Sequence, residues 1–154
     1  MRVSNWTRAT GRMTPADFAI LRDQVKHDEG LRLKPYTDTV GKLSIGYGRN
    51  LTDNGISGAE ASAMLEHDLE TTVAELTLAF PFVLSLEPVR QIVLGNMAFN
   101  MGVPRLKGFR KMWAALRAGD FETAALEMMD SKWSRDVGPR ATRLAEMMRR
   151  GEVL

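Results

Sequence analysis

The chain has 154 residues, of which 44% are hydrophobic and 26% are charged. These proportions are typical of an ordinary globular protein and exclude a low-complexity or disordered chain. Cysteine is absent, which excludes a disulfide framework and a thiolate metal site. The net charge of +2 is compatible with attraction to a polyanion but does not select nucleic acid, cell wall or anionic lipid.

The amino-terminal segment, residues 1–13, has no apolar run of the kind found in a signal peptide. No later segment has the length and apolar character of a membrane span. We therefore expect synthesis without a signal peptide and no stable membrane insertion. Residues 1–13 are expected to form an N-terminal arm, and residues 14–154 a single domain.

The first helix is predicted from its start signals. Thr14 is placed as N-cap, Pro15 as the first helical residue and Asp17 as the reciprocal capping acid. Gly30 is placed to end this helix in a left-handed turn, so Glu29 lies at the carboxyl end. The apolar residues at helical spacing are Phe18, Leu21 and Val25.

The next segment has the alternating pattern of a strand over residues 42–47. Residues 33–36 should pair with this strand across a turn at Asp38–Gly41. The two strands would form a hairpin, which must pack against a helix to be stable. Gly46 and Gly48 permit a bend or a close approach of another group to the backbone.

A second capping box, Ser57 with Glu60, predicts a long helix that extends to about Leu78. Beyond Pro81 the pattern is entirely helical. Glycine and proline residues divide this part into segments near residues 88–101, 109–118, 120–132 and 139–150. Methionines are expected as adaptable core residues, and include Met97, Met101, Met112, Met128, Met129, Met147 and Met148.

The candidate chemistry lies around the hairpin. Eight residues separate Glu29 from Asp38, and five separate Asp38 from Ser44. The pattern sets a carboxyl group at a helix end, where the helix dipole favours its protonated form, against a second carboxylate and a hydroxyl on the hairpin. Cleavage of a glycosidic bond needs two facing carboxyl groups. Taken singly, each residue also fits a structural role: a solvated glutamate, a turn aspartate and a strand serine.

Jointly, the pattern resembles the phage-type lysozymes, the endolysins of glycoside hydrolase family 24. The likeness covers roughly residues 25–150 and continues in the segments EGLRLKPYTD, IGYGRN, NMAFNMG, GFRKMWAAL and SKWSRDVGPRATR. It implies an α+β, lysozyme-like fold. A small β-hairpin lobe, about residues 29–56, would be joined by a long helix to a mainly helical lobe, about residues 79–154 plus 14–28, with the cleft between them.

The resemblance also implies residue roles. Glu29 takes the position of the proton donor, and Asp38 that of the carboxylate that orients or activates water. Ser44 takes a threonine position, keeps the hydroxyl and is expected to hold the water. Arg140 matches an arginine that approaches the glutamate, which would oppose the effect of the helix end, so the net effect on Glu29 stays open. The expected substrate contacts are Tyr36, Asn50, Phe99, Asn100 and Arg140.

Two departures from the family pattern lie after Gly48. The next position, often histidine in the family, is Arg49, which we expect to pair with Asp68 or Glu66. The chain between Arg49 and Ser57 is shorter than in the longest family members, so the hairpin lobe is expected to lack one small helix and a third strand.

These features predict an enzyme that hydrolyses the β-1,4 bond between N-acetylmuramic acid and N-acetylglucosamine in peptidoglycan. We expect inversion, a monomer, no metal or cofactor and no nucleic-acid partner. As a phage endolysin, it would act in the periplasm after holin-dependent release. Two alternatives remain: a lytic transglycosylase, which needs only the glutamate, and a non-catalytic wall- or nucleic-acid-binding helical module that uses the basic Lys132–Arg150 segment.

Overall fold

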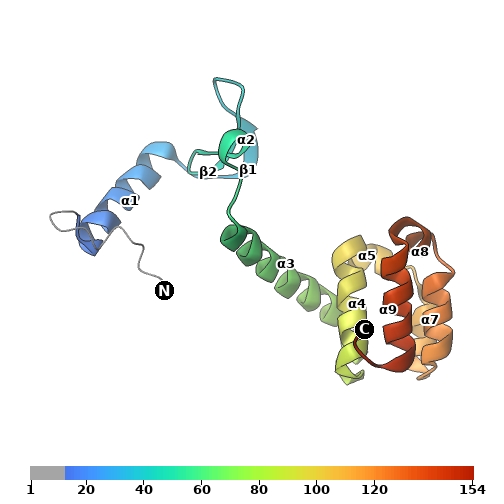
Figure 1. The fold of residues 1–154 in the computed structure, drawn as a ribbon. Helices are drawn as coiled ribbons and strands as arrows, with labels where there is room; N and C mark the ends of the chain where they lie inside the picture. Colours follow the sequence, from blue (N-terminus) through green and yellow to red (C-terminus); the bar gives the residue numbers. More distant parts are fainter. Residues whose placement is uncertain (1–12) are drawn as a thin grey trace. The chain divides into compact units, whose positions relative to one another are not determined.

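The structure, a computed structural model, describes residues 13–154 (Figure 1). The arm expected at residues 1–13 therefore lies outside the described residues, apart from Met13. The chain divides into two compact units, one ending at Glu60 and one spanning Ala61–Leu154, and each is described by itself. Helices combine with one antiparallel sheet, which confirms the α+β class. Among the described helices, none is both long and apolar enough to cross a bilayer.

The first helix, α1 (Pro15–Glu29), begins at the predicted capping box. The Asp17 amide donates to the Thr14 hydroxyl at 3.2 Å, and the Thr14 amide donates to the Asp17 carboxylate at 2.8 Å. At the other end Gly30 has the expected positive φ of 68°, but its ψ of 164° is extended. The expected left-handed turn is therefore wrong, and the chain passes from α1 directly towards the first strand.

The sheet has three strands, β1 (Arg32–Thr37), β2 (Leu43–Gly46) and β3 (Arg49–Asn50), in the order β1-β2-β3. The expectation of two strands is wrong, because β3 pairs with β2 along its other edge. The register of β1 against β2 shifts between Arg32 and Tyr36, around Pro35. Proline has no amide hydrogen, so an edge strand at an irregularity is where a sheet tolerates it.

A four-residue helix, α2 (Leu51–Asn54), follows β3 directly and corrects the expectation that this lobe lacks a small helix. The Asn50 side chain caps α2 by accepting the Asp53 amide at 3.0 Å. The long helix α3 (Gly58–Ala79) then begins at the predicted second capping box. The Glu60 amide donates to the Ser57 hydroxyl at 3.2 Å, and the Ser57 amide donates to the Glu60 carboxylate at 2.7 Å.

The second unit is helical, and α4, α9 and α7 lie side by side in it (Figure 1). The helices predicted at residues 88–101 and 139–150 have the predicted bounds. The segment predicted at 120–132 is divided into two helices, because the Ser131 hydroxyl caps a new helix by accepting the Ser134 amide at 3.0 Å. The elements are η2 (Pro81–Ser85), α4 (Pro88–Met101), α5 (Val103–Leu106), α6 (Arg110–Arg117), α7 (Phe121–Met129), α8 (Lys132–Val137) and α9 (Pro139–Arg150).

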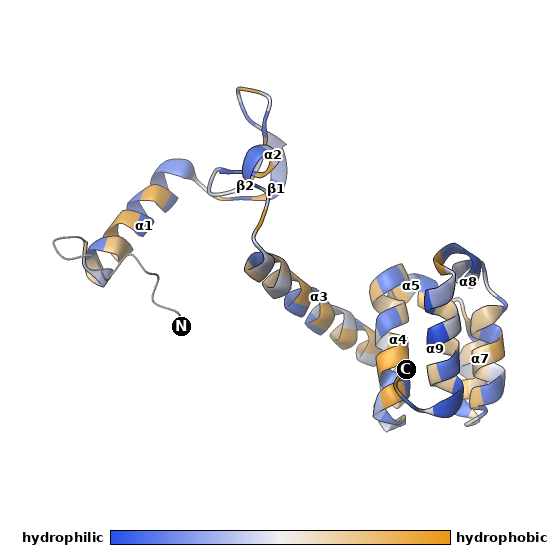
Figure 2. Cartoon of the chain, in the orientation of Figure 1, coloured by the Kyte–Doolittle hydropathy of each residue, from blue (hydrophilic) through white to orange (hydrophobic). Residues whose placement is uncertain are grey.

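The core of this unit joins α4, α6, α7 and α9, although the visible face of α9 is mostly hydrophilic (Figure 2). Trp113 of α6 stacks on Phe80, with ring centroids 3.8 Å apart. The methionine prediction is confirmed for five buried residues, Met97, Met112, Met128, Met147 and Met148. Met129, in contrast, is 38% exposed. Unbranched methionine side chains fill the irregular space between these helices.

A buried arginine closes the carboxyl end of α9. Arg90 of α4 is 5% exposed, and it donates from Nε to the Met148 carbonyl at 2.9 Å and from Nη2 to the Arg149 carbonyl at 3.2 Å. Its guanidinium lies over the Phe121 ring, 3.5 Å from the centroid, and pairs with Glu87. The last carbonyls of a helix have no partner inside the helix, so Arg90 supplies the missing donors.

Candidate active site

Glu29 is the last residue of α1, and its side chain is exposed. Its carboxylate lies against the backbone of Gly48, because a Cβ built on Gly48 would be only 3.0 Å from Glu29 Oε2. Gly48 has a φ of +79°, in the region that favours glycine. The predicted close approach at this glycine is therefore confirmed, and the group that approaches is the candidate proton donor.

Asp38 opens the turn between β1 and β2, as predicted. Its Oδ1 accepts two backbone amides, from Val40 at 3.0 Å and from Lys42 at 2.8 Å. Its own amide donates to the Lys42 carbonyl at 2.8 Å. Among the described residues, no hydrogen bond is made to Oδ2. One carboxylate oxygen is thus fixed by the turn, and the other is left to bind a water or a substrate group.

Ser44 lies in the central strand and is 3% exposed. Its Cα partners are Tyr36 on β1 and Asn50 on β3, so three of the predicted site residues form one row across the sheet. Directly opposed residues of an antiparallel pair project from the same face. Asp38 follows Tyr36 by two residues, just beyond the end of β1.

The two outer residues of this row, Tyr36 and Asn50, contact neighbouring side chains. The Tyr36 ring is covered by Arg32, whose Cζ is 4.4 Å from the ring centroid. The Asn50 amide group donates to Asp53 Oδ2 at 2.9 Å, while its oxygen caps α2. The substrate-binding roles expected for Tyr36 and Asn50 stay predictions, and Asn50 has a clear structural task beside them.

Arg49 does not take the expected acidic partner. It forms a two-pronged ion pair with Glu60, from Nη1 to Oε2 at 2.8 Å and from Nη2 to Oε1 at 2.6 Å. The expectation of Asp68 or Glu66 is wrong, because the Ser57 capping box already turns Glu60 back towards the sheet. The hydrogen bonds from Arg49, and then from the Ser57 backbone, lower the pKa of Glu60 to about 2.

In the helical unit, Asn100 lies at a pocket. Its side-chain oxygen accepts the indole N–H of Trp133 at 2.9 Å, and both residues line a cavity of about 990 Å³. Phe109 stands edge-on to Trp133, with ring centroids 6.4 Å apart. The lining also includes charged side chains, among them Arg105 and Asp130, so it is more polar than that of a typical small-molecule pocket. The sequence pattern assigned no role to Trp133 and Phe109, because their contact joins residues 24 positions apart in the chain.

The other two residues predicted in this unit have different surroundings. Phe99 is 41% exposed and does not line the cavity described above. Arg140 donates from Nε and Nη2 to the side-chain oxygen of Asn96, at 2.9 Å and 2.6 Å. The expected approach of Arg140 to Glu29 involves both units and stays a prediction.

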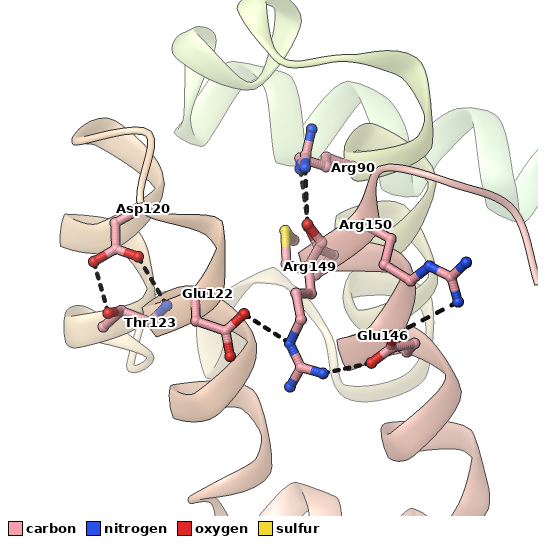
Figure 3. Close-up of polar contacts among 8 residues, drawn as sticks. Arg90, Asp120, Glu122, Thr123, Glu146, Arg149 and Arg150 are labelled. Atoms are coloured by element: carbon pink, nitrogen blue, oxygen red, sulfur yellow. Dashed lines mark hydrogen bonds and ion pairs between the residues drawn. The ribbon is translucent and has the colours of Figure 1, made fainter.

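Three of the six basic side chains in the Lys132–Arg150 segment form ion pairs with acidic neighbours. Arg149 pairs with Glu122 at 2.9 Å and with Glu146 at 2.6 Å, as Figure 3 shows. Arg150 pairs with Glu146 and Glu152, and Lys132 pairs with Asp136 at 2.8 Å. These ion pairs engage half of the segment's basic side chains, which weakens the alternative in which this segment is a polyanion-binding surface.

A small sheet that presents an aspartate, a buried serine and a nearby helix-end glutamate, in an α+β chain with a helical unit, is the arrangement of a glycoside hydrolase of the lysozyme type. The sequence comparisons agree. The family model named phage lysozyme matches residues 26–152. The chain belongs to this family, glycoside hydrolase family 24, and is a peptidoglycan hydrolase.

The match to this chain covers a different share of each relative's length. Probable T4-type lysozyme 2 of Dictyostelium discoideum is 26% identical, over 86% of this chain and 95% of that protein. An endolysin of Acyrthosiphon pisum secondary endosymbiont phage 1 is 30% identical, over 84% and 88%. The pre-baseplate central spike protein Gp5 of Enterobacteria phage T4 is 30% identical over 86% of this chain, which spans only 28% of the spike protein.

Proposed function

We propose that this hydrolase is an N-acetylmuramidase that cleaves the β-1,4 bond between N-acetylmuramic acid and N-acetylglucosamine. Glu29 gives a proton to the leaving oxygen, and Asp38 activates a water held by the Ser44 hydroxyl. The observation that carries the proposal is the row of Tyr36, Ser44 and Asn50 on the sheet, with Asp38 in the turn two residues after Tyr36. In this turn, Asp38 keeps one carboxylate oxygen fixed and one available for that water.

The proposed stereochemical outcome is inversion. The Glu29 carboxylate contacts Gly48, beyond one end of β2, whereas Asp38 belongs to the turn at the other end. A strand of four residues spans about 10 Å. Because the two carboxyl groups approach β2 from opposite ends, we expect them to lie farther apart than the separation of about 5–5.5 Å that direct attack by aspartate needs, with a water between them.

Two product measurements test this mechanism. Nuclear magnetic resonance on a defined muropeptide should show the α anomer first, and initial release of the β anomer would contradict inversion. Mass spectrometry should show a hydrated reducing end. An anhydromuramic product, with activity retained in Asp38→Asn, would instead identify a lytic transglycosylase.

We also propose that the helical unit contributes substrate contacts through Asn100, Phe99 and Arg140. We further propose that residues 14–28 act together with the helical unit as one lobe of the enzyme. The cavity beside Asn100 supports this assignment because it combines an aromatic wall with polar groups. Substitution of Asn100 by alanine should raise KM on peptidoglycan strands more than it lowers kcat, whereas Glu29→Gln should lower kcat.

In the cell, we propose a monomeric phage endolysin that reaches the periplasmic wall through a holin. The endolysin among the relatives supports this role. Expression in a Gram-negative host should cause lysis only when the inner membrane is permeabilised. A turbidity assay that compares wild type with Glu29→Gln under both conditions checks the release step and the chemistry separately.

A further inference from the structure

The turn that holds Asp38 depends on Lys42. Lys42 supplies both the amide that binds Asp38 Oδ1, at 2.8 Å, and the carbonyl that accepts the Asp38 amide, also at 2.8 Å. Any displacement of Lys42 therefore displaces the carboxylate of Asp38. What holds Lys42 and the adjoining Leu43 in place then determines where the carboxylate lies.

The support comes from α2. Lys42 Nζ pairs with Asp53 Oδ1 at 2.9 Å, and the Leu43 amide donates to the Thr52 hydroxyl at 2.9 Å. The short strand β3 pairs only with Ser44 and Ile45, so it does not reach Leu43. The Thr52 side chain thus provides the acceptor that a longer β3 would have provided from its backbone.

Asp53 is itself held in the same small network. Its Oδ2 accepts the Asn50 amide group at 2.9 Å, and its backbone amide donates to the Asn50 side-chain oxygen at 3.0 Å. Asn50 is the strand partner of Ser44. The network therefore connects the row that contains Ser44 to the turn that contains Asp38, through the first turn of α2.

We propose that Thr52 and Asp53 are positioning residues for catalysis, with α2 acting as a brace that fixes Asp38 relative to Ser44. The inference rests on the proposed role of Asp38. Neither Thr52 nor Asp53 is assigned a contact with reacting atoms. Both are exposed, and an exposed ion pair contributes little to stability. The principal effect of the brace is on geometry, where a displacement of about 1 Å can cost up to about 100-fold in rate.

The first test compares two substitutions at Thr52. Thr52→Val keeps the shape and removes the acceptor, and we expect kcat to fall about tenfold on a defined muropeptide with KM within about twofold. Thr52→Ser restores the hydroxyl and should recover kcat to within about threefold of wild type. Thr77→Val is the matched control, since within residues 13–154 the Thr77 hydroxyl bonds only to carbonyls of its own helix; it should leave kcat unchanged.

The second test asks whether Thr52 acts through Asp38. Asp38→Asn keeps an oxygen for the Val40 and Lys42 amides but removes the negative charge. In that background Thr52→Val should cause no further loss of the residual rate, because interacting sites are not additive. Circular dichroism should show the same fold in every variant.

The outcomes separate the brace from the wider mechanism. A Thr52→Val enzyme with wild-type kcat, equal losses in Thr52→Val and Thr52→Ser, or a full additive loss in the Asp38→Asn background would each overturn the brace while leaving Asp38 as a catalytic residue. Full activity of Asp38→Asn alone would instead refute the proposed function.

Discussion

Trp133 donates its indole N–H to the side-chain oxygen of Asn100, at 2.9 Å, and so connects α8 to α4 beside the cavity that both residues line. Trp133 is only 8% exposed, so its indole N–H has little access to water, whereas Asn100 is an exposed residue. Removal of the Asn100 acceptor therefore has a measurable cost.

Asn100→Leu should destabilise the fold by about 1–3 kcal/mol, because it leaves the indole N–H without an acceptor. Trp133→Phe removes the donor, and the double variant should be less destabilised than the sum of the single variants. Denaturant unfolding of the four proteins measures this coupling. Strict additivity would show that the bond does not contribute to the folded state.

Gly48→Ala should impair catalysis more than folding. The added Cβ would be 3.0 Å from Glu29 Oε2, and the residue would keep a φ of +79°. We expect a stability cost of about 1–2 kcal/mol from the backbone and a fall in kcat of about tenfold or more from displacement of the carboxyl group.

Gly119→Ala is the control for that prediction. Gly119 has a similar φ of +70°, but nothing lies within 4 Å of its added Cβ. It should show the same loss of thermal stability with normal kcat. If both variants keep full activity, the contact between Glu29 and Gly48 has no part in positioning the acid.

The Arg49–Glu60 pair predicts a distinct acid dependence. The pKa of Glu60 is lowered to about 2 from an ordinary value of 4.5, chiefly by hydrogen bonds from Arg49. A lowered folded-state pKa contributes stability above the unfolded value and loses it as the pH falls from about 4.5 towards 2. Glu60→Gln should therefore flatten the decline of Tm in that window, while Asp17 and Asp120, whose pKa values are also lowered, retain their share.

Thermal unfolding at intervals between pH 2 and 6, with wild type and Glu60→Gln in parallel, measures this difference. Arg49→Lys should give an intermediate profile because lysine cannot form the two-pronged pair. Superimposable profiles for wild type and Glu60→Gln would contradict the assignment.

Arg90→Met should be strongly destabilising although the volume is similar. The carbonyls of Met148 and Arg149 would lose their donors, and Phe121 would lose its cation. We expect a loss of about 2–4 kcal/mol, which corresponds to a fall in Tm of roughly 2–4 °C for each kcal/mol. Arg135→Met, at an exposed position, should change the free energy of unfolding by less than about 0.5 kcal/mol.

The elements that carry their own start signals could be predicted from the sequence. Thr14 with Asp17 and Ser57 with Glu60 mark helix starts locally, and the structure has both capping boxes. Asp38 and Ser44 were also predictable as turn and strand residues, since each role follows from immediate neighbours.

The features that the sequence did not predict are too short for a local pattern or depend on contacts between residues far apart in the chain. A two-residue strand and a four-residue helix are too short for periodicity, so β3 and α2 were not expected. The partner of Arg49 is set by how the chain folds back after Gly55, and the contact of Trp133 with Asn100 crosses 33 positions in the chain. Thr52 lacked any signal, because its role follows from the early end of β3.

Pro35 also affects whether the sheet can pair with a strand from another copy of the chain. A free strand edge is a template on which another copy can add its own strand. On β1 the proline removes one amide hydrogen and the shifted register spoils the regular spacing of the others, while β3 on the far side offers only two residues. We therefore expect edge-to-edge aggregation to be disfavoured from both sides, so that the protein would stay dispersed even at high concentration.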